Sequence, residues 1–371
     1  MKIGFDAKRC FRNTTGLGNY SRHIVDMLAS SPEEFDLHLY TPKTGNAYPS
    51  PPKDAHIHFP SGIWKGPLGS VWRTTQLASE AASDHIDIFH GLSNELPIGL
   101  HKKGIASVVT IHDLIFERYP SFYKTADRKI YRKKFYHAAH SADIVVAISE
   151  QTKFDLMEFY KVPESKIQVI YQDCNPVFDT NFSEEELSKI TRDYNLPSEF
   201  ILQVGTLEQR KNVGTTVRML AHIPEIPLVL VGRSTPYFEA LMKEAELGGY
   251  ADRIHHIRVD GMRDLAAFYQ MATVFVYPSL FEGFGIPIIE ALRSKTPVVT
   301  TNSGVFPEAG GPDSLYINPE DEEELANSVQ LLLNDSELRQ SAVDAGYAFA
   351  EKFRTSQLLS EWTTLYKRLK K

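Results

Sequence analysis

Two glutamates, Glu282 and Glu290, stand eight positions apart in SLFEGFGIPIIEA, where an apolar run gives way to a helical pattern. Gly283 and Gly285 let the backbone approach a ligand closely, and Pro287 suits the first residue of a helix, whose free amides bind anions. Carboxylates beside such a site are suited to a neutral, hydroxyl-rich group, because one carboxylate can accept from two vicinal hydroxyls. The spacing favours sugar binding over the alternative that Glu290 complements a helix dipole and Glu282 is solvated.

A second loop of this kind is VGTLEQRKN, residues 204–212, again between an apolar run and a helical pattern. Arg210 and Lys211 in this loop could neutralise a diphosphate at the favourable end of the helix. The alternative is that both side chains are simply solvated. A second phosphate-type loop in the same chain favours the binding role.

Near the N-terminus, Gly16 and Gly18 lie in a loop between a predicted strand and a predicted helix. The pattern resembles a dinucleotide fingerprint, but the third glycine would fall at Ser21 and no acidic residue ends the next strand. We therefore expect no nicotinamide cofactor. We do expect a glycine turn that packs a helix near a ligand.

His112 follows another apolar run, in VVTIHDL. At the carboxyl end of a strand, a histidine can hydrogen-bond a substrate hydroxyl or take part in proton transfer. The alternative is a structural histidine, and the position at a strand end favours the functional role.

The elements that would position these residues are short apolar runs alternating with helical patterns, which predicts α/β domains with parallel sheets covered on both faces. A break in the periodicity predicts a boundary near residue 180, between a first domain (1–180) and a second domain (181–353). A final helix, 354–371, is expected to pack back toward the N-terminal domain. The predicted strands are 2–6, 36–40, 57–60, 87–91, 106–112, 143–149 and 167–171 in the first half, and 200–205, 227–232, 254–259, 274–279, 297–301 and 314–318 in the second.

Composition and charge exclude several classes of protein. The chain of 371 residues has net charge −7, with 21 Lys/Arg against 20 Asp/Glu in residues 1–180 and 19 against 27 thereafter. An acidic protein of this kind is poorly suited to binding nucleic acid.

The N-terminus lacks the apolar stretch of a signal peptide, which predicts a cytoplasmic protein. The two cysteines offer neither metal spacing nor a disulfide scaffold.

One basic stretch, Lys124–Lys134, places six Lys and Arg residues among aromatic ones. On a helix it could touch an anionic membrane surface at the inner face of the membrane, or the phosphate of an acceptor. The alternative is a solvated basic face.

Together these stretches resemble the family 4 glycosyltransferases, which have the GT-B fold of two facing Rossmann-like domains and an inter-domain cleft. The resemblance implies that residues 1–180 form the acceptor-side domain and residues 181–353 the nucleotide-sugar domain. The most specific element is EGFGIPIIE, Glu282 to Glu290, followed by KTPVVTTNSGVFPEAGG. One departure is Thr206, where many members have an arginine, and Arg210 would supply that charge here.

The resemblance implies a role for each matching residue. Glu282 would face the donor sugar, Glu290 would hold the nucleotide ribose, and Lys211 with Arg210 would meet the diphosphate. Gly16 and Gly18 would lie under the donor, His112 would contact the transferred sugar, and the amides of Phe284 and Gly285 would approach the sugar and diphosphate. The other implied ligand-binding positions are Gly205, Thr206, Gly283, Ile286 and the backbone near Val259, the last for the base.

The implied reaction retains the donor's anomeric configuration and needs no metal and no cofactor, consistent with the lack of an Asp-x-Asp triplet in the sequence. Fixed positive groups would stabilise the leaving diphosphate. Similarity to bacterial mannosyltransferases of polysaccharide assembly favours GDP-mannose as donor, with a glycan or lipid-linked saccharide as acceptor. The alternatives are a nonhydrolysing sugar-nucleotide epimerase and a non-catalytic sugar-nucleotide-binding protein.

Overall fold

The computed structural model describes residues 1–223 and 225–370, and the chain divides into two compact units. The first unit comprises Met1–Gln172 and Thr355–Lys371, and the second comprises Asp173–Arg354. The chain therefore changes unit between Gln172 and Asp173, whereas the sequence interpretation put the boundary near residue 180. The last helix belongs to the first unit.

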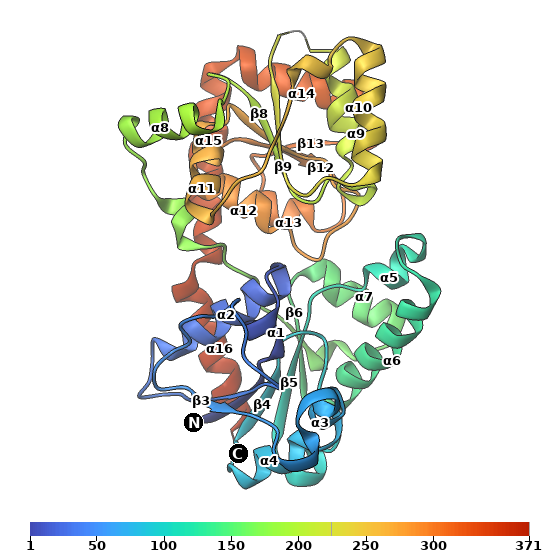
Figure 1. The fold of residues 1–371 in the computed structure, drawn as a ribbon, viewed down its shortest axis with the longest axis vertical. Coiled ribbons are helices and arrows are strands. Elements are labelled where there is room, and N and C mark those ends of the chain that lie inside the picture. The colour runs from blue at the N-terminus through green and yellow to red at the C-terminus, as the bar shows by residue number, and fades with distance from the viewer. Residues whose placement is uncertain (224, 371) are drawn as a thin grey trace. The chain divides into compact units, whose positions relative to one another are not determined.

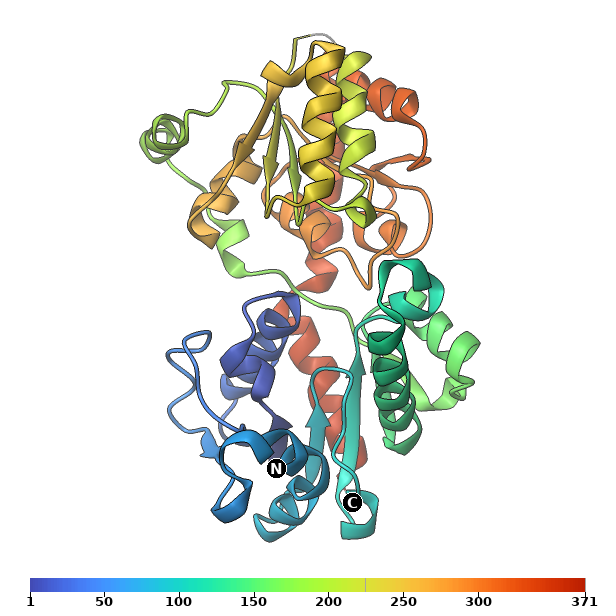
Figure 2. The same ribbon diagram turned by 45° about the vertical axis from the view of Figure 1, so that its right-hand side comes forward.

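The first unit is built on a seven-stranded parallel sheet in the order β3-β2-β1-β4-β5-β6-β7. Helices lie on both of its faces (Figures 1 and 2). Its strands are β1 Lys2–Asp6, β2 Asp36–Tyr40, β3 His56–His58, β4 Ile88–Gly91, β5 Ala106–Ile111, β6 Ile144–Ala147 and β7 Ile167–Val169. Its helices are α1 Lys8–Arg12, α2 Gly16–Ala29, α3 Gly69–Thr75, α4 Leu77–Ser83, α5 Ile115–Arg118, α6 Thr125–Ser141, α7 Glu150–Tyr160 and α16 Thr355–Leu369.

The strands of this sheet are apolar throughout because consecutive residues enter two different cores. Ile88 and Val108 belong to the core beneath α2 and α16, whereas their neighbours Phe89 and Val109 belong to the core on the opposite face. Side chains alternate across a strand, so a strand covered on both faces needs apolar residues at every position. This is the physical origin of the apolar runs in the sequence.

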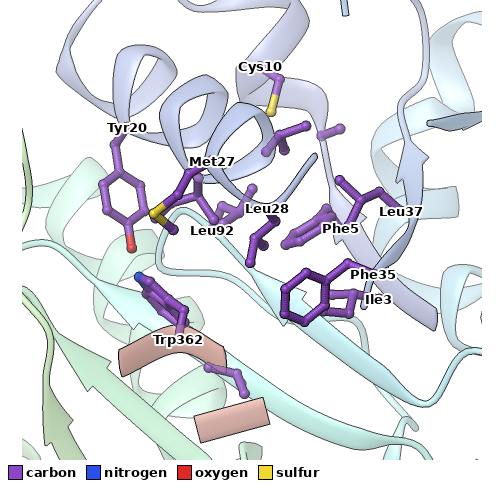
Figure 3. Packing of buried hydrophobic residues seen from close by; sticks show 14 of the residues in the cluster. Ile3, Phe5, Cys10, Tyr20, Met27, Leu28, Phe35, Leu37, Leu92 and Trp362 are labelled. Atoms are coloured by element: carbon purple, nitrogen blue, oxygen red, sulfur yellow. The ribbon is translucent and has the colours of Figure 1, made fainter. Parts of the chain in front are cut away.

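Helix α16 completes the first of these cores. Trp362 on α16 is fully buried and points toward Met27 and Tyr20 of α2 (Figure 3). Tyr366, one turn further along, donates or accepts a hydrogen bond with Nδ1 of His90 at 2.7 Å. The C-terminal helix is therefore an integral layer of the first unit.

The second unit contains a six-stranded parallel sheet in the order β10-β9-β8-β11-β12-β13. The predicted α/β class, with two Rossmann-like units, is confirmed. The strands are β8 Ile201–Val204, β9 Leu228–Val231, β10 Ile254–Ile257, β11 Val274–Tyr277, β12 Val298–Thr301 and β13 Leu315–Ile317. The helices are α8 Glu184–Tyr194, α9 Val213–Arg218, α10 Pro236–Gly248, α11 Met262–Met271, α12 Ile286–Arg293, α13 Phe306–Gly310, α14 Glu322–Asn334 and α15 Ser336–Ala350.

Two details differ from the sequence interpretation. The expected open loop after β1 contains the short helix α1, whose Cys10 and Phe11 are buried. Pro287 is the second residue of α12, since the helix begins at Ile286. Proline is tolerated there because the first amides of a helix have no partner within it.

No helix within the described residues is both long and apolar enough to cross a bilayer.

Candidate functional site

The two loops that the sequence singled out follow adjacent strands of the second unit. Strands β8 and β11 pair in parallel, with Val274 opposite Ile201 and Phe275 opposite Leu202. Parallel neighbours end at the same edge of a sheet, so the loop after β8 and the loop after β11 meet there. The structure thus brings together the two phosphate-type loops of the sequence.

At this edge Lys211 and Glu282 form an ion pair, with 2.6 Å between Lys211 Nζ and Glu282 Oε1. Lys211 Nζ also donates to the hydroxyl of Tyr277 at 2.5 Å. An ammonium group has three donors, and its third N–H has no partner among the described residues. The Lys211 side chain is 14% exposed, so this third donor is available to a ligand.

Glu282 is held by one oxygen and leaves the other open. Oε1 accepts from Lys211, from Ser279 Oγ at 2.7 Å and from Tyr277 OH at 3.2 Å, and it pairs with Arg210 at 2.9 Å. Over the described part of the chain, no hydrogen bond involves Oε2. Burial disfavours the charged carboxylate, but Lys211 and Arg210 outweigh burial and lower the pKa of Glu282 to about 2. The group is therefore an ionised acceptor at neutral pH.

Arg210 fastens the two loops to each other. Its Nη1 donates to the carbonyl of Phe281 at 3.0 Å, and its own carbonyl accepts from the Leu280 amide at 2.9 Å. Ser279 Oγ lies 3.0 Å from the same carbonyl oxygen and shares its single hydrogen between that oxygen and Glu282 Oε1. The guanidinium also pairs with Glu208 at 3.0 Å. In this arrangement Arg210 positions Glu282, and its charge remains beside any anion that enters.

Glu290 lies in α12 and is 8% exposed. Its Oε2 accepts a hydrogen bond from the hydroxyl of Tyr269 at 2.9 Å, and within the described ranges Oε1 makes no hydrogen bond. Burial raises the pKa of Glu290 to about 7, against the lowering effects of the Tyr269 hydroxyl and the charge of Lys211. Both glutamates thus have one oxygen fixed by the protein and one left for a ligand hydroxyl.

Three glycines allow the backbone to pass closely at this edge. Gly205 directly follows β8 with φ of +140°, and a Cβ on Gly232, after β9, would lie 1.8 Å from the Gly205 carbonyl oxygen. Gly285 has φ of +126° at the start of α12. Side chains rarely adopt this conformation, so these positions favour glycine.

The remaining predicted positions in the second unit have mixed environments. Phe284 is buried and packs edge-on against Phe353 with 5.4 Å between ring centroids, so its side chain is part of the core. Thr206, Val259, Gly283 and Ile286 are partly buried, and Val259 lies between β10 and α11.

In the first unit, His112 follows β5 and is buried. Its Nε2–H donates to the carbonyl of Leu92 at 2.9 Å, which leaves the lone pair on Nδ1, and its ring packs edge-on against Tyr20 at 4.6 Å. Burial lowers the pKa of His112 to about 4. In the part of the chain that the structure describes, Nδ1 has no hydrogen-bond partner. A neutral ring of this kind is suited to accepting a hydrogen bond from a hydroxyl, and it is a weak base at neutral pH.

Gly16 and Gly18 lie in the first turn of α2, which also carries Tyr20. A Cβ on Gly18 would stand 1.9 Å from the carbonyl oxygen of Asn13, so the turn itself requires glycine there. A Cβ on Gly16 would meet nothing within 4 Å. Space beside Gly16 is consistent with a ligand-facing turn.

The sequence interpretation missed Tyr277, Ser279 and Tyr269, which hold the two glutamates. Tyr277 and Ser279 lie two positions apart at the end of β11, and residues with that spacing face the same side of a strand. This spacing could have identified them. Tyr269 lies on α11, and only the packing of α11 against α12 brings it to Glu290.

Two family models match the chain. The model described as "Glycosyl transferases group 1" matches residues 186–349, and the model described as "Glycosyltransferase Family 4" matches residues 14–172. Each match falls within one structural unit.

Curated relatives include "O-antigen chain mannosyltransferase B" of Escherichia coli, which is 27% identical over 388 aligned residues that cover the whole of both chains. "Serotype-specific mannosyltransferase WbdA" of Escherichia coli is 28% identical over 268 residues, 67% of this chain and 32% of that protein. This chain therefore spans about a third of WbdA. Among solved structures, sucrose-phosphate synthase from Thermosynechococcus elongatus has a TM-score of 0.78 at 21% identity, covering 100% and 99% of the two chains, a likeness of fold.

Proposed function

This chain belongs to the glycosyltransferases and has their GT-B fold, and from that premise we propose that it transfers mannose from GDP-mannose to a glycan or lipid-linked saccharide. The proposed donor sugar is supported by the names of its mannosyltransferase relatives. The proposed reaction retains the configuration at the anomeric carbon.

One observation supports a transfer site above all others: the charged cluster of Lys211, Arg210 and Glu282 at the edge of the second sheet. In this cluster, one N–H of Lys211 has no partner among the residues described, and Oε2 of the ionised Glu282 has no hydrogen bond among them either. A nucleotide sugar has a diphosphate that can bind the lysine and hydroxyls that can bind the carboxylate.

In the proposed reaction, the bond between the sugar's anomeric carbon and the β-phosphate oxygen breaks. The acceptor hydroxyl oxygen bonds to that carbon on the same face, and its proton passes to the departing phosphate oxygen. Lys211 and Arg210 stabilise the charge that develops on the diphosphate, while Glu282 holds the sugar through its hydroxyls. We propose that His112 of the first unit, whose Nδ1 has no partner among the described residues, accepts a hydrogen bond from a sugar hydroxyl.

The experiment that tests the function begins with thermal stabilisation by GDP, UDP, ADP and their sugars, followed by incubation of the preferred donor with saccharide acceptors. We expect GDP and GDP-mannose to stabilise the protein most and a mannoside to form whose anomeric configuration, by NMR, matches that of the donor. Stabilisation by UDP alone would reject the donor. A product of inverted configuration would reject retention, and isomerised nucleotide sugar without a glycoside would indicate an epimerase.

We propose that Glu290 holds the nucleotide ribose as a carboxylate, which predicts a pH dependence of binding. With a pKa of about 7, Glu290 is mostly protonated at pH 6. A protonated carboxyl group accepts hydrogen bonds from the two ribose hydroxyls less strongly than a carboxylate does. Nucleotide affinity should rise about tenfold between pH 6 and pH 8 as the carboxyl ionises, measured by calorimetry. Glu290→Gln should bind weakly and lose this rise.

The control separates Glu290 from the nucleotide's own phosphate, which titrates in the same range. In the same pH series, the affinity of Glu290→Gln changes only through the phosphate. The affinities of the natural protein and of the variant should differ less for 2′-deoxy-GDP than for GDP. An identical pH profile for the variant and the natural protein would rule out the ribose role.

The proposed acceptor includes lipid-linked saccharides, with α6 as the membrane contact. On this helix and its N-terminal cap, Lys124, Lys129 and Lys133 are exposed, as is the apolar side chain of Ile130 at 52%. Arg132 is instead paired with Glu117. Exposed lysines beside an exposed apolar residue are suited to an anionic membrane surface.

A further inference from the structure

A cluster of histidines and aspartates lies on the edge of the first sheet, on strands β2 and β3, apart from every residue assigned above. Residues two positions apart share a face of a strand, so Asp36, His38 and Tyr40 project from one side of β2. The register pairs His38 with His56 and Tyr40 with His58, which puts the two β3 histidines on that same face.

Three side chains in this cluster converge on one point. His38 Nε2 lies 3.4 Å from Asp36 Oδ1, and His56 Nε2 lies 3.2 Å from the same oxygen. Tetrahedral Zn²⁺ with bonds of about 2.0–2.1 Å to nitrogen and oxygen separates its ligand atoms by about 3.3–3.4 Å. These two distances fit a tetrahedral metal ion, and all three ligand atoms lie within 4.8 Å of one another.

His38 supplies a second, independent sign of a missing ligand. It is 6% exposed, and its Nε2 is buried with no hydrogen-bond partner among the described residues. A buried polar atom without a partner is costly, and in native proteins it usually indicates an unseen water, ion or ligand.

A count of protons shows that one contact around His38 and His58 lacks a hydrogen. The groups form a row, Asp36, His38, His58 and Asp84, with His38 Nδ1 2.9 Å from His58 Nε2 and His58 Nδ1 3.4 Å from Asp84 Oδ2. The row has three contacts that each need one hydrogen, but two neutral imidazoles carry only two. One ring nitrogen must therefore turn its lone pair toward a carboxylate unless a cation is added.

A metal ion on His38 Nε2 would supply that cation. His38 Nδ1–H then donates to His58 Nε2, and His58 Nδ1–H faces Asp84, so that every contact in the row has its hydrogen.

We propose that Asp36, His38 and His56 bind a divalent transition-metal ion, Zn²⁺, with solvent as the fourth ligand. His56 and Asp36 have side chains 59% and 38% exposed, which leaves the outer side of the ion open to water. Two imidazoles and one carboxylate favour Zn²⁺ over Mg²⁺, which prefers oxygen ligands. His58 is a positioning residue that orients His38, as an outer partner of a metal-bound histidine does.

The ion would hold the edge of the sheet together. Strand β3 has three residues and pairs only with β2 in the described sheet, so the ion adds a cross-link that the short ladder lacks. The segment 41–55 between these strands carries Tyr48, whose ring packs against Phe11 of α1. An ion that holds β3 in place would therefore also restrain the segment that packs against α1 through Tyr48.

The test is titration of the tag-free, chelator-treated protein with Zn²⁺, and with Co²⁺ as a spectroscopic probe. We expect one ion per chain, a visible Co²⁺ spectrum of four- or five-coordinate type, and a higher thermal unfolding midpoint with Zn²⁺ than with Mg²⁺. His56→Gln should abolish the Co²⁺ spectrum. Because its side chain is largely exposed, this substitution should leave the fold intact, as judged by circular dichroism.

Two further variants define the site. His58→Gln should weaken Zn²⁺ binding by about 10–100-fold while the Co²⁺ spectrum persists, since it acts through His38. His101→Gln, a change of an exposed histidine in the same unit, should have no effect. Absence of Zn²⁺ binding by the natural protein would overturn the proposal, and so would unchanged affinity in both His56→Gln and Asp36→Asn.

Discussion

Lys211→Met should lower the turnover of sugar transfer by about 10²–10³-fold, the loss typical of removing one preorganised group that stabilises charge in the transition state. The methionine keeps the side chain's length but lacks the N–H that is available to the diphosphate. Turnover is measured at saturating donor and acceptor, so that a loss of affinity does not enter the comparison.

The same substitution should also lower the free energy of unfolding by about 1–3 kcal/mol, because it leaves Glu282 with fewer charged partners. Arg210 remains beside Glu282 at 2.9 Å and limits the loss. The double variant Lys211→Met with Glu282→Gln removes both partners of the pair. It should recover much of the stability, since replacing both members of a buried pair costs less than removing one.

The double variant separates a chemical role from a structural one. Its transfer rate is compared with that of Glu282→Gln alone, because Glu282 itself holds the donor sugar. If Lys211 acts on the diphosphate, the double variant transfers more slowly than Glu282→Gln. Equal rates in these two variants would mean that Lys211 only balances Glu282, and wild-type turnover in Lys211→Met would reject the role altogether. Lys189→Met, which changes an exposed lysine paired with Asp193, serves as the control for replacing a lysine by methionine.

Arg293→Met should lower the free energy of unfolding of the second unit by about 3–5 kcal/mol, the cost of breaking a buried ion pair. Arg293 lies on α12 with its side chain 2% exposed, and its guanidinium pairs with Asp173 and Asp179. The Nε donates to Asp179 Oδ1 at 2.6 Å. Removing this cation leaves two carboxylates without their central partner.

Urea denaturation measures this loss, and the matched control is again Lys189→Met, whose exposed pair should contribute no more than about 1 kcal/mol. Arg293→Lys should fall between the natural protein and Arg293→Met, because lysine keeps the charge without the planar fork. A loss in Arg293→Met no larger than in the control would show that the network contributes little.

The sequence predicted the strands well because their burial leaves a local trace. Each strand covered on both faces must be apolar at consecutive positions, as Ile88 with Phe89 and Val108 with Val109 illustrate. Helix starts left a similar trace. Helix α8 begins with a capping box, in which Ser183 and Glu186 satisfy each other's backbone amides.

The sequence also identified Glu282, Glu290, Arg210 and Lys211, because glycines and charges at strand ends are unusual enough to be noticed. It could not provide the ionisation of the glutamates. Glu282 has its pKa lowered to about 2 by two cations from another loop, despite burial, whereas burial raises the pKa of Glu290 to about 7. Identical residue types eight positions apart therefore have opposite shifts.

The sequence by itself determined the α/β class, the strands and the loops in which the chemical groups lie, since each depends on periodicity and composition within a short stretch. Only the tertiary structure decided which groups meet. Lys211 reaches Glu282 because β8 and β11 pair, although 71 positions separate the two residues. His38 meets His56 because β2 pairs with β3. Contacts of this kind depend on strand order and register, and neither is recorded in the local pattern of residues.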